Sequence, residues 1–65
     1  MYQNILAEMA RNGYTREKLA TEIGISVVSL RKKIKGEIPF NINDILKILS
    51  IFGQELTFEY LFKKF

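Results

Sequence analysis

The chain has 65 residues, 48% of them hydrophobic and 26% charged, with a formal net charge of +3. This length predicts one domain, residues 1–65, with a small core and modest stability. Because the chain contains no cysteine and no histidine, disulfides, Cys/His zinc sites and Ser-His catalysis are excluded.

The seven acidic residues are spread along the chain without an obvious acid/base pair. We therefore expect no enzyme, no cofactor and no small-molecule ligand. The N-terminal residues lack the basic segment and apolar run of a signal peptide. No stretch approaches the about 18 apolar residues of a membrane span. The sequence thus predicts a soluble, cytoplasmic protein, and the positive charge is consistent with an anionic partner.

The first predicted helix covers residues 2–12 and ends at Gly13. Apolar side chains recur at the spacing of one helix face. These residues are Tyr2, Ile5, Leu6, Met9 and Ala10.

Two short helices follow, 15–23 or 16–23 and then 26–35. Thr15 and Ser26 stand where an N-cap hydroxyl is expected. Gly24 and Gly36 stand where each helix would end in a left-handed cap. The inward face of the first helix is formed by Leu19, Ala20 and Ile23, and that of the second by Val27, Leu30 and Ile34.

Pro39 prevents a helix from passing through the loop 36–40. The fourth helix is predicted at 42–52, with Asn41 as N-cap and Asp44 as the reciprocal partner of a capping box. Its wide apolar face is formed by Ile42, Ile45, Leu46, Ile48, Leu49 and Phe52. Lys18 and Lys47 are expected in solvent.

The tail 54–65 allows two interpretations. Thr57 is a suitable cap for a short helix at 58–62. The alternation of apolar residues from Leu56 to Phe62 is also typical of a strand. With the helix as the preferred interpretation, the chain is an all-α domain of four or five helices.

A tight glycine-containing turn between two short helices is the pattern of a helix-turn-helix. The segment "TREKLATEIGISVVSLRKKIKG" resembles that of the phage repressor/Cro-like (XRE-type) DNA-binding regulators. The segments "PFNINDILKIL" and "FEYLF" extend the resemblance to the fourth and last helices of phage-encoded members. The matching positions of the helix-turn-helix are Leu19, Ala20, Ile23, Gly24, Ile25, Ser26, Ser29, Leu30 and Gly36.

The resemblance implies a compact, four- to five-helix, lambda-repressor-like domain that binds double-stranded DNA with helix 26–35 in the major groove. Carried over by position, the base-contacting residues are Val27, Val28, Arg31 and Lys32. Lysine donates to guanine, whereas valine packs on the methyl group of thymine. The phosphate-contacting residues are Arg16, Ser26, Lys33, Lys35 and Asn41.

Two positions depart from the family pattern. Arg16 replaces the usual glutamine at the start of the second helix, and Ile34 carries the apolar side chain that many members have at the position of Lys33.

The predicted function is a transcriptional repressor of phage or mobile-element origin that binds operator DNA as a homodimer. The candidate dimer contacts are Phe58, Tyr60, Phe62 and Phe65. The alternative is a protein-binding module on the same fold, with an antirepressor, a toxin or a replication component as partner. Exposed valines at 27 and 28 would suit either function.

Overall fold

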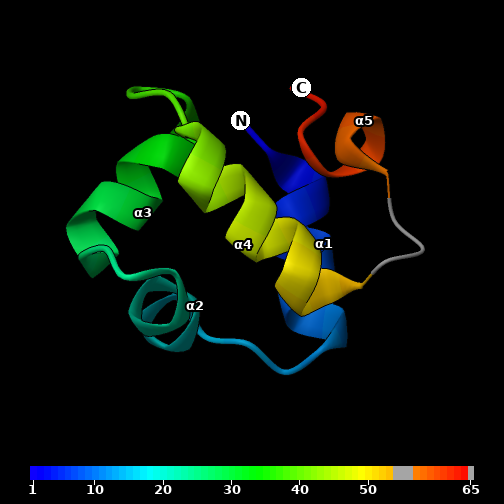
Figure 1. The fold of residues 1–65 in the computed structure, drawn as a ribbon, viewed down its shortest axis with the longest axis horizontal. Helices are drawn as coiled ribbons and strands as arrows, with labels where there is room; N and C mark the ends of the chain where they lie inside the picture. Colours follow the sequence, from blue (N-terminus) through cyan, green and yellow to red (C-terminus); the bar gives the residue numbers. More distant parts are fainter. Residues whose placement is uncertain (54–56, 65) are drawn as a thin grey trace.

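Five helices follow one another in the computed structural model, which describes residues 1–53 and 57–64 (Figure 1). No strand occurs within these ranges. The helices are α1 (Gln3–Arg11), α2 (Arg16–Ile23), α3 (Val27–Lys35), α4 (Ile42–Phe52) and α5 (Phe58–Leu61). The all-α prediction is confirmed, and α1 is one residue shorter at each end than the predicted helix.

Four of the helices begin at the side chains that the sequence predicts as N-caps. The hydroxyl groups of Thr15, Ser26 and Thr57 each accept a hydrogen bond from the amide three residues ahead, at 3.0 to 3.1 Å. Asn41 and Asp44 form the predicted capping box at the start of α4. These caps satisfy amides that have no partner within the helix.

The core lies where α1, the α2–α3 pair, α4 and α5 meet. Its fully buried large side chains come from all five helices, so each helix contributes to one shared interior. These side chains are Ile5, Leu19, Leu30, Ile34, Ile48 and Leu61.

The buried face of α1 differs from the predicted one, because Ala10 is exposed and Glu8 is buried. The Glu8 carboxylate accepts hydrogen bonds from Arg11 Nη1 at 2.7 Å and from Tyr60 Oη at 3.0 Å. The acceptor carboxylate also holds the pKa of Tyr60 above its ordinary value. Charge-assisted hydrogen bonds of this kind allow a carboxylate to remain inside a small protein.

The predicted apolar face of α4 is too wide. Ile48 and Phe52 are buried, but Ile42 and Leu46 are 66% and 57% exposed. The helix turns Asp44 inward instead, and Asp44 is 3% exposed. The ion pair that Asp44 forms with α3 sets this rotation.

The tail helix is confirmed over Phe58–Leu61, one residue shorter than predicted. Asn4 Nδ2 donates to the carbonyl of Tyr60 at 2.7 Å and joins α1 to α5. The ring of Phe62 meets the edges of Tyr2 and Phe40 at centroid distances of 5.9 and 5.3 Å. The strand alternative began at Leu56, which lies outside the described residues.

Candidate nucleic-acid interface

The turn between α2 and α3 has the geometry that the glycine predicts. Gly24 has a φ of 79°, in the left-handed region that side chains rarely adopt. The amides of Gly24 and Ile25 both donate to the carbonyl of Ala20, at 2.9 and 3.0 Å. These bonds end α2, and α3 begins after a turn of three residues, so the helix-turn-helix is present.

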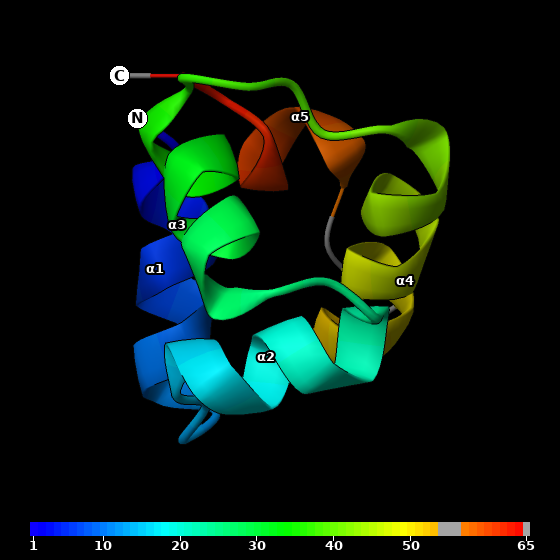
Figure 2. The same ribbon diagram turned by 90° about the vertical axis from the view of Figure 1, so that its left-hand side faces the viewer.

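Buried side chains hold the two helices of the unit together. Leu19 and Leu30 are fully buried, and Ala20 is only 1% exposed. Figure 2 shows α2 running beneath α3, with α4 on the other side of the molecule. The small side chain of Ala20 suits the close approach of α2 and α3.

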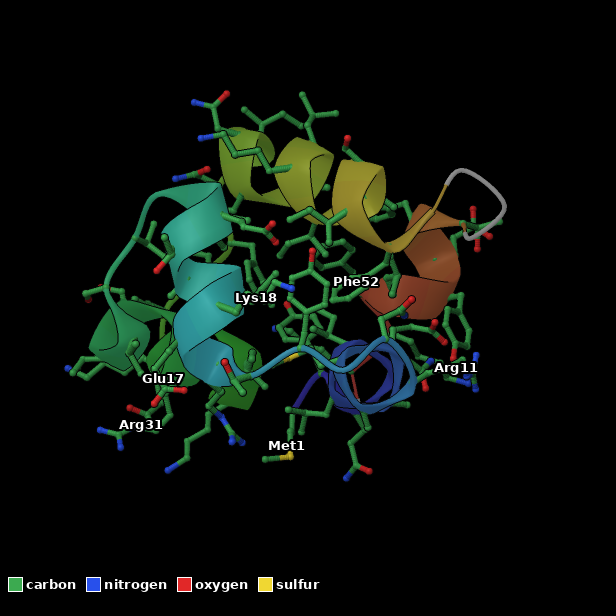
Figure 3. All side chains as sticks on the ribbon, turned by 90° about the horizontal axis from the view of Figure 1, so that it is seen from below. Met1, Arg11, Glu17, Lys18, Arg31 and Phe52 are labelled. Carbon is green, nitrogen blue, oxygen red and sulfur yellow. The ribbon has the colours of Figure 1, made fainter. Side chains whose placement is uncertain are left out.

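Three of the four predicted base-contacting residues form an exposed face of α3. Val28, Arg31 and Lys32 are all exposed, Val28 at 52%, and their spacing places them on one side of the helix. Figure 3 shows Arg31 projecting on the side of the molecule away from α4. Val27 differs, because it is only partly exposed and packs against the core. Val28 is therefore the exposed member of the valine pair.

The predicted phosphate contacts fall into two groups. Arg16, the first residue of α2, and Lys35, the last of α3, are exposed cations. The side chains of Ser26 and Asn41 are exposed but already serve as helix caps. These two residues would therefore mark places where helix amides, rather than their own side chains, meet an anion.

Lys33 is the exception among the predicted phosphate contacts. It is 8% exposed, and its ammonium group pairs with the Asp44 carboxylate. A buried ammonium that is bound to a carboxylate is not available to DNA, so this residue leaves the predicted phosphate set. The sequence held a signal for this placement, because Lys33 has the inward spacing of Leu30 and Ile34.

Lys47 is exposed, as predicted, but its ammonium group also contacts α2. Its Nζ donates to the carbonyl of Ile23, the last residue of α2, at 3.3 Å. A cation at this end of a helix is favoured by the exposed carbonyls and by the helix dipole. Lys47 therefore connects α4 to the end of α2, a role that no local pattern indicates.

Tyr14 supports the start of α2 from the side opposite the turn. The rings of Tyr14 and Phe52 make a T-shaped contact with 5.3 Å between centroids, and Lys18 Nζ lies 4.7 Å from the centre of the Tyr14 ring. A hydrogen bond to the Glu22 carboxylate raises the pKa of the Tyr14 hydroxyl. These contacts hold α2 against the C-terminal end of α4.

Other kinds of site find no support in residues 1–53 and 57–64. No group of acidic residues there could hold a metal ion. None of the helices in that part of the chain has the length and apolar character needed to cross a membrane. The exposed cationic face of α3 is the feature that favours an anionic ligand.

The comparisons with known proteins agree with this geometry. The scan against protein-family models matches one described as helix-turn-helix over residues 5–58. The match includes α2, the turn, α3 and α4. The searches of curated proteins and of solved structures returned no match.

Proposed function

Because this chain belongs to the helix-turn-helix family of Cro/C1-type, non-enzymatic DNA-binding regulators, we propose that it is a sequence-specific transcriptional regulator. In this proposal residues 1–65 form one DNA-binding domain, and α3 lies in the major groove of operator DNA. The observation that carries the proposal is the exposed face of Val28, Arg31 and Lys32 on a helix that is capped at both ends.

The exposed residues divide into two roles. Lys32 and Arg31 would donate to guanine, and Val28 would pack on a thymine methyl group. Arg16 and Lys35 would neutralise phosphates and fix the position of α3 in the groove. Val27, which is half-buried, would contribute less to base contact than Val28.

The regulator would act as a homodimer that occupies two half-sites about 34–36 Å apart and blocks polymerase. The likeness of residues 39–49 to phage-encoded members supports a phage or mobile-element origin.

Salt dependence tests DNA binding directly. If Arg16 and Lys35 of two protomers neutralise four phosphates, the affinity for a selected duplex should fall about 150-fold between 50 and 200 mM salt. The duplex comes from selection on random sequences, and titrations at several salt concentrations give the slope. No binding tighter than about 10⁻⁶ M to any duplex at moderate salt would contradict the proposal.

Two substitutions separate base reading from phosphate contact. Lys32→Ala should relax the preference at one base pair by about 1–3 kcal/mol, because one set of hydrogen bonds is lost. Arg16→Ala should weaken all duplexes alike and reduce the salt slope by about 1 per protomer. Equal effects of the two substitutions on matched and mismatched duplexes would contradict this division of roles.

The dimer contact is proposed at the aromatic tail. Phe58 is 51% exposed and stacks on Phe62, with 5.1 Å between centroids. Tyr60 and Phe62 are half-buried, so less of their surface is free for a partner, and Phe65 lies outside the described residues. Exposed aromatic surface of this kind favours a protein contact.

Phe58→Ser should therefore raise the dissociation constant of the dimer about tenfold or more, the effect of losing one buried aromatic anchor. Sedimentation equilibrium without DNA measures it. Leu46→Ser, at an equally exposed residue of α4, is the matched control. If Leu46→Ser dissociates the dimer and Phe58→Ser does not, the dimer contact lies on α4 instead.

A protein-binding module remains the second candidate, and the exposed apolar residues Val28, Ile42 and Leu46 favour it. An apolar contact with a protein would not weaken steeply with salt. The salt titration therefore also distinguishes the two functions.

A further inference from the structure

α4 contacts both helices of the helix-turn-helix through charged side chains one turn apart. Asp44 pairs with Lys33 of α3, and Lys47 donates to the carbonyl of Ile23 in α2. Asp44 and Lys47 are three residues apart, so they leave the same helix at neighbouring points. We call these two contacts the α4 clamp.

The contact between Asp44 and α3 is buried, and the position of the Asp44 carboxylate is fixed. Lys33 and Asp44 are 8% and 3% exposed, and the same Asp44 oxygen accepts from the amide of Asn41 at 3.2 Å. Because the capping box fixes this carboxylate on α4, it defines one place for the Lys33 ammonium. A buried ion pair adds little net stability over an apolar pair, but it penalises arrangements that leave either charge unpaired.

The contact with α2 acts at the turn itself. Ile23 is the last residue of α2 and precedes Gly24, from which the chain turns toward α3. The Lys47 ammonium therefore holds the end of α2, while Asp44 holds the C-terminal half of α3. Together the two side chains connect both helices of the helix-turn-helix to α4.

We infer that Asp44 and Lys47, with Lys33, are positioning residues that set the orientation of α3 for base reading. The inference rests on the proposed function, in which α3 reads bases. Contacts to base edges demand accurate placement, whereas phosphate attraction tolerates a shift of the helix. Loss of the clamp should therefore reduce sequence preference more than overall attraction to DNA.

The test compares specific and non-specific affinity in variants of the full chain. Lys33→Met with Asp44→Asn removes both charges of the buried pair and keeps a side-chain oxygen for the Asn41 amide. Lys47→Met removes the bond to Ile23 and keeps the length of the side chain. Asn4→Ala is the control, because it removes the α1–α5 bond of 2.7 Å and leaves the clamp intact.

All variants are titrated with the selected duplex and a scrambled duplex, at a temperature where circular dichroism shows that they are folded. The ratio of specific to non-specific association constants should fall about tenfold in the double variant, the effect of one lost base contact. It should fall several-fold in Lys47→Met and stay unchanged in Asn4→Ala. The salt slope should stay at its wild-type value, because no phosphate contact is removed.

A purely structural role would lower both association constants through the folded fraction and leave their ratio unchanged. A wild-type ratio in either folded clamp variant overturns the inference, and Lys47→Met decides alone if the double variant does not fold. A salt slope reduced by about 1 per protomer would instead assign Lys33 to a phosphate and overturn its positioning role. If the wild-type chain prefers no duplex, the proposed function itself fails.

Discussion

Replacing Asp44 with alanine should destabilise the protein by about 3–5 kcal/mol, because the buried Lys33 ammonium loses the carboxylate with which it is paired. The bond from the Asn41 amide to the Asp44 carboxylate, one half of the capping box of α4, is lost at the same time. Since small domains have a free energy of unfolding near 5 kcal/mol, much of the population should be unfolded. Urea unfolding followed by circular dichroism measures the effect.

Glu37→Ala is the matched control for this substitution. It removes the same charge from an exposed residue of the loop before α4, so stability should change by less than about 0.5 kcal/mol. Lys33→Met in the Asp44→Ala background should restore part of the lost stability, because no charge then remains buried. An Asp44→Ala variant within about 1 kcal/mol of wild type would show that Lys33 reaches water and that the pair is not buried in solution.

The second large effect is expected at Leu30, which is fully buried in the core. Leu30→Ala should cost about 2–5 kcal/mol, through lost burial and the cavity that remains. Because Leu30 connects α3 to α2, the helix-turn-helix should lose its packing. Chemical unfolding gives the change in free energy.

Val28→Ala is the partner experiment, two residues earlier on the same helix. Val28 is 52% exposed, so the free energy of unfolding should change by less than about 0.5 kcal/mol. Its effect should be on DNA instead, as a weaker preference for thymine at one position. A large loss of stability in Val28→Ala, or none in Leu30→Ala, would show that α3 is rotated in solution.

The sequence predicted most of the helix boundaries, because they depend on local chemistry. Thr15, Ser26, Asn41 and Thr57 act as caps through atoms within three residues. The left-handed turn at Gly24 is local as well. These features need no knowledge of the rest of the fold.

The sequence did not predict which polar side chains are buried. Glu8 is inside because Tyr60, 52 residues away, donates to it. Lys33 is buried because its ammonium group pairs with the carboxylate of Asp44, 11 residues away. Periodicity assigns apolar residues to a face, but a polar residue is buried only where a distant partner satisfies it.

The sequence predicted part of the candidate site, namely which side chains of α3 are exposed. Val28, Arg31 and Lys32 lie on the expected surface because α3 has a regular 3.6-residue period. Val27 and Lys33 share the inward spacing of Leu30, and they contact the core and α4 instead. The family pattern places residues along the helix, but the contacts within this chain decide which of them face outward.

The bond from Asn4 to the carbonyl of Tyr60 joins residues 56 positions apart, and Leu61 is fully buried beside it. During synthesis on the ribosome, α1 therefore appears well before α5, the helix that it contacts through this bond. The helix-turn-helix can form earlier from near neighbours, but the shared interior stays open to water until residue 62 has left the exit tunnel. Until α5 has been synthesised, the part of the interior that Leu61 fills stays uncovered, so completion of the fold follows synthesis of the tail.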